Sequence, residues 1–146
     1  MSEMEQVKLF TVEEANRLIP KLTEWLHDLH ARQKQLAAFE VEIDALELVT
    51  KKPEEGLSPE IAKKVEEYNQ RVTAFYEILD KIHDLGCYLK DVEIGLIDFC
   101  MIYQERMVYL CWKLGEAEIT HWHDIGRGYS QRQPLILDSE EKESSG

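Results

Sequence analysis

The feature that most constrains the fold is an apolar repeat of seven residues that runs between positions 18 and 82. Apolar residues recur in alternating steps of four and three, which is typical of helices that pack along one stripe. In the first run they are Leu18, Leu22, Trp25, Leu29, Leu36, Phe39, Ile43 and Leu46. In the second run they are Ile61, Val65, Tyr68, Val72, Phe75, Leu79 and Ile82. The pattern predicts a long antiparallel two-helix hairpin that resembles a coiled coil.

Local signals define the first helix, which we expect over residues 11–49. Thr11 can cap the helix, and Glu14, three residues later, can reach back to the Thr11 amide. Pro20 lies inside the apolar pattern, where a proline removes a backbone donor and clashes with the preceding turn. We therefore expect a kink near Pro20 or a short first segment.

The second helix is expected over residues 58–86. Ser58 can cap its start, and Pro59 suits the first helical position because its backbone has no N–H to satisfy. Gly86 is a natural C-terminal stop. The polar stretch 51–56, KKPEEG, then forms the connection between the two helices.

Arg32 occupies the single polar place in the first apolar stripe. Antiparallel pairing across the short connection places Arg32 beside Phe75. There its methylene stem can pack and its guanidinium can lie on the ring. The alternative is that Arg32 is a functional residue or an oligomer contact.

After Gly86 the repeat changes from seven to two, which indicates strands. We expect strands at Leu96–Tyr103 and Met107–Leu114, joined by a two-residue loop at 105–106, and a third at Ile119–His123. The loop pairs Tyr103 with Val108, Met101 with Leu110, Phe99 with Trp112, and Ile97 with Leu114. Since this face is wholly apolar, it should pack on the helices. The fold class is therefore α+β, with a small antiparallel sheet of about three strands in residues 95–137.

The opposite face of the expected sheet carries polar and sulfur-containing side chains. In this register Asp98 lies across from Lys113, and Cys100 lies across from Cys111. Two thiols at cross-strand distance can bind a soft metal or form a redox pair. The alternative is that both cysteines are small buried apolar residues.

His121 and His123 would share one face of the third strand. Two imidazoles with this spacing are a workable pair of ligands for zinc, manganese or iron. A third ligand would have to come from another segment, and the candidates are Asp98, Asp124, Glu93 or a cysteine. The alternative is that one histidine makes a structural hydrogen bond and the other is solvated.

The glycine-flanked Arg127, with Tyr129 and Arg132, forms a candidate ligand-binding loop. Glycines permit close backbone approach, and two arginines can clamp a small carboxylate or phosphate. The alternative is a turn in which the arginines pair with local acids such as Asp98 or Glu116.

Composition excludes several classes of function. Charged residues make up 32% of the chain and the net charge is −12, which repels the phosphates of nucleic acids. No apolar run approaches the roughly 20 residues that span a bilayer, and the first ten residues do not resemble a signal peptide. We expect a cytoplasmic protein with reduced cysteines that binds neither nucleic acid nor membranes.

The chain is expected to form one domain over residues 1–137, since 146 residues suffice for one buried core. The stretch 138–146, DSEEKESSG, is acidic and has no apolar residue. We expect it to be a disordered tail.

Five segments carry a resemblance to a known family. They are FTVEEAN at 10–16, GLIDF at 95–99, LCWKLGE at 110–116, WH at 122–123, and GYSQRQP at 128–134. In this order they resemble an uncharacterised bacterial family catalogued as domain of unknown function 2203, over nearly the whole chain. The resemblance implies a small bacterial protein without an established activity. The positions it emphasises are Asp98, Glu116, His123 and Arg132; His121 lies outside these segments.

Two functions remain open. In the first, the protein binds a small ligand or a metal with the four polar residues above. Its sharper form is an enzyme in which His123 is the acid or base, Asp98 orients it and Arg132 holds an anion. In the second, the hairpin forms a homodimer or binds a partner helix, and the polar residues are an internal ion-pair network.

Overall fold

The computed structural model describes residues 7–49 and 58–136. The expected connection at 51–56 and the expected tail at 138–146 lie outside the described residues. The chain divides into two compact units, which are Met1–Leu26 with Lys81–Gly146, and His27–Asp80. We call them the sheet unit and the hairpin unit. No helix in the described parts of the chain is long and apolar enough to cross a membrane.

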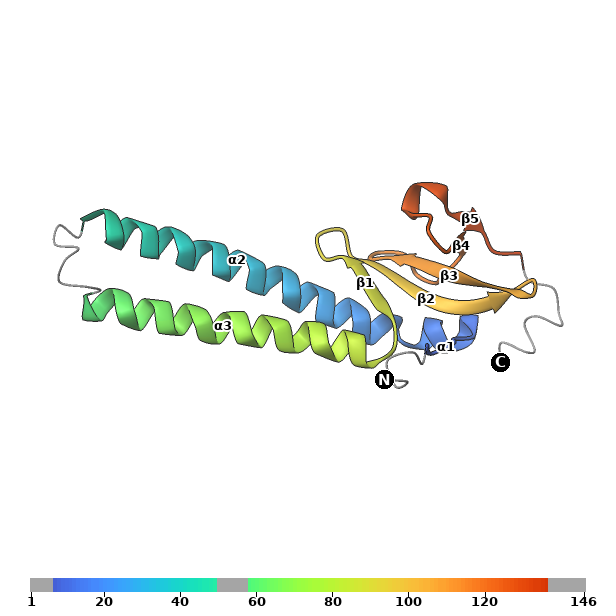
Figure 1. Ribbon diagram of the computed structural model, residues 1–146, viewed down its shortest axis with the longest axis horizontal. Coiled ribbons are helices and arrows are strands. Elements are labelled where there is room, and N and C mark those ends of the chain that lie inside the picture. The colour runs from blue at the N-terminus through green and yellow to red at the C-terminus, as the bar shows by residue number, and fades with distance from the viewer. Residues whose placement is uncertain (1–6, 50–57, 137–146) are drawn as a thin grey trace. The chain divides into compact units, whose positions relative to one another are not determined.

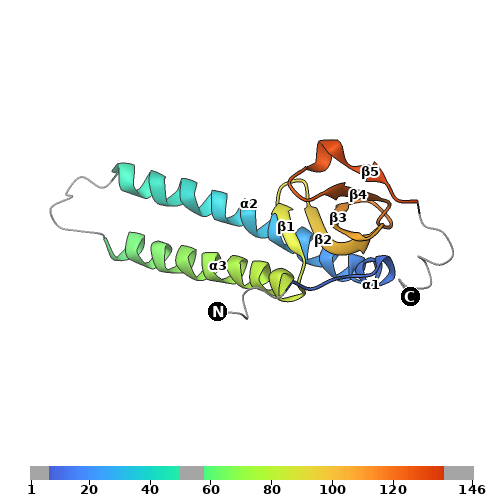
Figure 2. The same ribbon diagram turned by 45° about the vertical axis from the view of Figure 1, so that its right-hand side comes forward.

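The hairpin unit contains most of α2 (Ile19–Val49) and α3 (Pro59–Asp84), which run antiparallel side by side (Figure 1 and Figure 2). Among the described residues, three hydrogen bonds between side chains join the helices. They are Lys64 Nζ with Glu42 Oε1 at 2.8 Å, Tyr68 Oη with Glu40 Oε2 at 2.6 Å, and Arg71 Nη1 with Gln35 Oε1 at 3.0 Å. The contacts agree with the antiparallel register expected from the two apolar stripes.

Arg32 does not take the expected role. Its Nε donates to Asp28 Oδ1, one helical turn earlier, at 3.1 Å. The cations that lie over an aromatic ring in this unit are Arg71 and Lys64, at 4.9 and 5.4 Å from the centroid of Phe39. The local i,i+4 ion pair satisfies Arg32 within its own helix.

The helix ends follow the local signals, but residues 7–49 and 58–136 contain three α-helices rather than two. α1 (Val12–Arg17) begins with the full capping box, in which the Thr11 and Glu14 backbone amides donate to each other's side chains at 3.0 Å. Leu18 separates α1 from α2, so Pro20 falls in the first turn of the second segment, where its missing N–H costs little. Ser58 Oγ accepts from the amide of Ile61 at 3.1 Å and caps α3.

The sheet has five antiparallel strands in chain order, rather than about three (Figure 2). They are β1 (Tyr88–Asp91), β2 (Leu96–Tyr103), β3 (Arg106–Lys113), β4 (His121–Asp124) and β5 (Gln133–Pro134). The two outer strands were not expected, because runs of four and two residues are too short to show an alternating pattern. A 3-10 turn, η3 (Tyr129–Gln131), precedes β5.

The register of the central strand pair differs from the expected one by two residues. Tyr103 pairs with Arg106, so the two-residue turn is Gln104-Glu105 and not 105–106. Both turn residues have positive φ, 52° and 67°, as a type I′ turn requires. A shift of two keeps every side chain on its expected face, so the separation into an apolar and a polar face is correct.

One face of the sheet is apolar, and we call it the helix-facing face. Its residues are Ile97, Phe99, Met101, Tyr103, Val108, Leu110, Trp112 and Trp122, all of them buried. Phe10, just before α1, packs edge-on against Phe99 with ring centroids 5.1 Å apart. In α1, Asn16 Oδ1 accepts from the amide of Ile119 at 2.8 Å. Burial of each large apolar side chain contributes about 1.5–3 kcal/mol, so this face forms the core of the sheet unit.

Candidate functional site

The other face of the sheet, which we call the polar face, gathers unlike side chains from three adjacent strands. Its residues are Asp98 and Cys100 from β2, Tyr109 and Cys111 from β3, and His121 and His123 from β4. The register sets Asp98 opposite Cys111 and sets Tyr109 opposite His123. Asp98 and His123 are each 2% exposed and Cys111 is fully buried. A carboxylate, an imidazole and a thiol, each able to bind a metal or exchange a proton, are therefore shielded from water.

Asp98 and His123 are hydrogen-bonded to each other, with Nε2 and Oδ2 3.1 Å apart. The other ring nitrogen of His123, Nδ1, lies 3.0 Å from the carbonyl oxygen of Asp124. A carbonyl can only accept, so Nδ1 carries the hydrogen and Nε2 of the neutral ring presents a lone pair. Because the carboxylate also presents lone pairs, one cation, a proton or a metal ion, must lie between Nε2 and Oδ2.

The second oxygen of Asp98 is also notable. Among the described residues no hydrogen-bond donor reaches Oδ1, although the atom is buried. Burial raises the pKa of Asp98, and the lowering effects of His123, Lys90 and the Cys111 thiol do not reverse it. Buried polar atoms normally have partners, so an orphaned carboxylate oxygen is typical of a site for a ligand or an ion.

Cys111 completes a group of three ligand atoms. Among the described residues, Asp98, Cys111 and His123 form a group whose carboxylate oxygen, Sγ and ring nitrogen all lie within 4.8 Å of one another. Burial raises the pKa of Cys111 to about 11, and a hydrogen bond from Arg132 opposes this rise. Ligands around a tetrahedral zinc ion lie roughly 3.5 Å apart, given metal–ligand distances of about 2.0–2.3 Å. The His123 Nε2–Asp98 Oδ2 distance of 3.1 Å is already close to this spacing.

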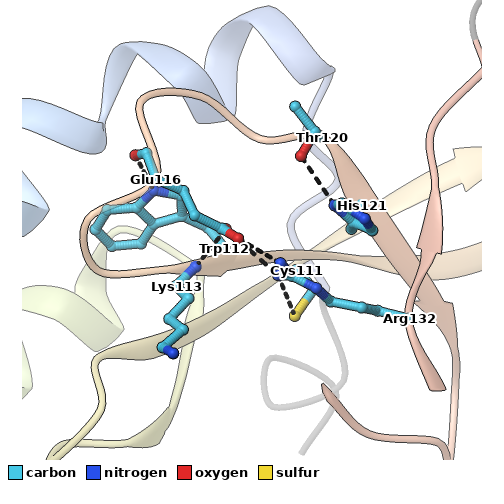
Figure 3. A network of polar contacts seen from close by, with 7 residues as sticks. All are labelled: Cys111, Trp112, Lys113, Glu116, Thr120, His121 and Arg132. Atoms are coloured by element: carbon cyan, nitrogen blue, oxygen red, sulfur yellow. Dashed lines mark hydrogen bonds and ion pairs between the residues drawn. The ribbon is translucent and has the colours of Figure 1, made fainter. Parts of the chain in front are cut away.

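Arg132 and Glu116 form a second pair beside Cys111 (Figure 3). The Arg132 guanidinium binds the carboxylate with both ends, through Nη2 to Oε2 and through Nη1 to Oε1, the latter at 3.3 Å. Nη1 also lies 3.8 Å from Cys111 Sγ. The guanidinium packs over the Tyr129 ring, 4.4 Å from its centroid. Glu116 thus fixes the Arg132 guanidinium in a position from which it donates toward the Cys111 thiol.

The electrostatics of this pair follow from its hydrogen bonds. Partial burial acts to raise the pKa of Glu116, but hydrogen bonds from Arg132 and from the amide of Lys113, at 2.9 Å, outweigh it, so the pKa is lowered. The hydrogen bond to Glu116 raises the pKa of Arg132 further above its already high value. Both groups are charged at neutral pH.

The structure brings the four residues emphasised by sequence together as two pairs, Asp98 with His123 and Glu116 with Arg132, and places Cys111 between them. The expected pairing of Cys100 with Cys111 is wrong. Cys100 lies opposite Tyr109, because the turn begins one residue earlier than expected and the pairing register therefore shifts by two.

The expected pairing of Asp98 with Lys113 is wrong for the same reason. Lys113 pairs with Leu96 in the strand register, and its Nζ lies 5.6 Å from the centroid of the Tyr129 ring. The vacated position opposite Asp98 is taken by Cys111.

The remaining candidates lie around these pairs. His121 is half-buried opposite Cys111, and its Nδ1 is hydrogen-bonded to Thr120 Oγ1 at 2.9 Å (Figure 3). Arg127 is exposed. The sequence pattern pairs Cys111 with Cys100, whereas the structure pairs it with Asp98. Knowing the position of the turn between β2 and β3 would have predicted the correct pairing.

Comparison with known proteins places the chain in a family. It belongs to the family described as "Uncharacterized conserved protein (DUF2203)", which its residues 8–135 match. No curated protein and no solved structure matches it. Any function must therefore be argued from the site.

Proposed function

We propose that this protein binds a divalent transition-metal ion through Asp98, Cys111 and His123. The observation that carries the proposal is the contact between His123 Nε2 and Asp98 Oδ2 at 3.1 Å. Both atoms present lone pairs, and the orphaned Asp98 Oδ1 lies beside them. A divalent ion would replace the proton between Nε2 and Oδ2. Its positive charge would also neutralise the buried carboxylate of Asp98, which is shielded from water.

The groups around the three ligands support the proposal. Metal-binding histidines usually donate their other ring N–H to a carbonyl or carboxylate, and His123 does so to Asp124. The Arg132 guanidinium, fixed by Glu116, donates toward Cys111 Sγ. Such outer contacts fix the orientation of ligands before the ion arrives.

Burial favours metal binding over a direct acid–base role for His123. A general acid or base must reach the reacting atoms of a substrate, within about 3 Å or through one water. Asp98 and His123 are each 2% exposed, which leaves their polar atoms little access to a substrate in solution. A metal ion needs only the space between the three ligand atoms.

The test is metal analysis of protein purified without a chelator, followed by thermal melts of chelator-treated protein with added zinc, iron or manganese. We expect one ion per chain and a rise in melting temperature with an accepted ion. The variants Asp98→Asn and His123→Gln should lose the ion. The matched control is His121→Gln, on the same strand and face but outside the ligand group. A metal-free protein whose melting none of the ions shifts would refute the proposal.

A second candidate function is self-association through the hairpin unit, favoured by a second apolar stripe on α2. This stripe is separate from the one that faces α3, and every member of it is exposed. Its members are Ala31, Ala38, Val41, Ala45 and Leu48, in steps of three, four and seven. Small residues at heptad spacing let two helices approach closely.

The occupant we propose for this stripe is α2 of a second copy of the chain, in antiparallel orientation. The charges beside the stripe favour that orientation. Lys34, in line with the stripe, lies toward its start, whereas Asp44 and Glu47 lie toward its end. Antiparallel pairing therefore sets the basic part of each helix against the acidic part of the other.

Sedimentation velocity over a range of concentrations tests the dimer. Val41→Glu should raise the dissociation constant more than about tenfold, because it buries a charge in the proposed contact. The control is Ile102→Glu, which changes an exposed residue in the sheet unit. A wild-type protein that stays monomeric at high micromolar concentration would exclude the dimer.

A further inference from the structure

We infer that the proposed metal site selects ions of the zinc class over manganese, magnesium and calcium, and that Cys111 is the residue that sets this selectivity. The inference rests on the proposed function, because it assumes that Asp98, Cys111 and His123 hold a metal. It goes further in naming which ions the site accepts and which side chain decides between them.

The donor set is the first argument. The group offers one sulfur, one imidazole nitrogen and one carboxylate, and sulfur is the unusual member. Thiolate prefers soft and borderline ions such as Zn²⁺, Co²⁺ and Fe²⁺, whereas Mg²⁺, Ca²⁺ and Mn²⁺ prefer oxygen ligands. Replacing the sulfur with oxygen would therefore shift the preference of the three ligands toward Mg²⁺, Ca²⁺ and Mn²⁺.

The dryness of the site is the second argument. Magnesium takes about six oxygen ligands and usually retains several waters, and calcium takes about six to eight oxygens. The three ligand residues are at most 2% exposed. A tetrahedral ion that binds three protein ligands and one further group fits such a layer better than an ion that keeps a hydration shell.

Charge balance is the third argument. A thiolate and a carboxylate together carry two negative charges, which a divalent ion neutralises, and His123 contributes no charge as a ligand. Arg132 and Glu116 already neutralise each other through a two-ended ion pair. The loaded site is therefore neutral overall, as a buried position requires.

Cys100 provides the matched control for Cys111. Both cysteines lie on the polar face and both are buried, at 2% and 0% exposed. Cys100 pairs with Tyr109 in the strand register and does not belong to the ligand group. The two residues thus differ mainly in their position relative to Asp98 and His123.

The experiment compares Zn²⁺, Co²⁺ and Mn²⁺ binding to the chelator-treated full chain and to Cys111→Ser, Cys100→Ser and Cys111→Asp. The wild type should bind Zn²⁺ and Co²⁺ far more tightly than Mn²⁺. Its cobalt complex should show a sulfur-to-cobalt charge-transfer band in the near ultraviolet. Loss of an outer contact to a ligand typically costs about 10–100-fold in affinity, so loss of the ligand in Cys111→Ser should cost more than about 100-fold for Zn²⁺. Cys100→Ser should match the wild type in affinity and spectrum.

Cys111→Asp keeps the charge and supplies oxygen, so it should lose the charge-transfer band and gain Mn²⁺ affinity relative to Zn²⁺. Circular dichroism checks that each variant is folded. Metal binding without the sulfur band, or a Cys111→Ser variant with wild-type Zn²⁺ affinity, would overturn this inference and leave the metal site standing. Failure of the wild type to bind any of the three ions would overturn both.

Discussion

The two faces of the sheet are built from alternate residues of the same strands, yet they bury very different groups. On the helix-facing face, Phe99 and Trp112 are fully buried among other apolar side chains. On the polar face, Asp98 and His123 are almost as deeply buried. Burial of aromatic rings stabilises the fold, whereas burial of a carboxylate opposes it unless a partner compensates. One face therefore maintains the structure, whereas the buried polar groups of the other face are the ones that the proposed metal site would use.

The largest effect on stability should come from the helix-facing face. Phe99→Ala should lower the free energy of unfolding by about 3–5 kcal/mol, because it removes a buried ring and leaves a cavity beside Phe10. Urea denaturation measures the loss. The control, Ile102→Ala on the same strand, removes a half-exposed side chain and should change stability by less than about 1 kcal/mol. A Phe99→Ala loss as small as that of the control would show that this face is not the core.

An intermediate effect is expected at the edge of the polar face. Arg132→Met should cost about 1.5–3 kcal/mol, because Glu116 keeps a partly buried carboxylate without its charged donor. Arg127→Met is the control, since that arginine is exposed. In a double-mutant cycle, adding Glu116→Gln should restore part of the loss. Strict additivity of the two substitutions would mean that the pair does not couple.

A small effect is expected at the centre of the polar face. In chelator-treated protein, Asp98→Asn should change the free energy of unfolding by less than about 1 kcal/mol. The amide removes a buried carboxylate, and its N–H can donate to Nε2 of His123. A chelator should therefore lower the melting temperature of the wild type and leave that of Asp98→Asn unchanged. A loss comparable to that of Phe99→Ala would show that Asp98 is structural, and would remove the contrast between the faces.

The smallest effect is a difference in pH dependence between two acids. The pKa of Glu116 is lowered from 4.5, so its stabilising contribution is present above that unfolded value and is lost as the pH falls through the folded pKa. The pKa of Asp98 is raised from 3.8, so its contribution is present below that value and is lost as the pH rises through the folded pKa.

Chelator-treated wild type, Glu116→Gln and Asp98→Asn should therefore be compared by urea denaturation between roughly pH 3 and 7. The advantage of the wild type over Glu116→Gln should shrink toward low pH. Relative to the wild type, Asp98→Asn should gain stability as the pH rises. Parallel curves for all three proteins would contradict both signs.

The sequence predicts the helical regions and the two faces of the sheet, though not the division of the first helix into two, because these features depend on short-range signals. The capping box at Thr11 and Glu14 and the alternation along β2 both act within a few residues. The break at Leu18 agrees with the short first segment expected from Pro20. Such features can be predicted without knowing which strands are neighbours in the sheet.

The proposed metal site depends on which strands are neighbours and in which register, which explains why Cys111 was paired with the wrong residue. Alternation is unchanged by a register shift of two, so the apolar pattern cannot choose between Cys100 and Asp98 as the partner of Cys111. Gln104-Glu105 lacks the glycine or asparagine that usually marks a type I′ turn, so the turn could not be located.

The choice of His121 with His123 has a related cause. Residues two apart on one strand lie roughly 6.6 Å from each other, whereas cross-strand neighbours lie at about 4.5–5.5 Å. The group in the structure takes one residue from each of three strands, Asp98, Cys111 and His123. Asp98 lies directly opposite Cys111, whereas His123 lies opposite Tyr109 and is a diagonal neighbour of Cys111. A motif within one strand does not reveal such a group.

The turn at Gln104-Glu105 has a consequence for how this family can diverge. Two residues inserted there would slide β3 along β2 by two positions and would still direct every apolar side chain toward the helices. The same insertion would carry Cys111 about 7 Å away from Asp98. A relative with such a shift would keep the fold and lose the proposed metal site, so membership of the family would not by itself imply metal binding.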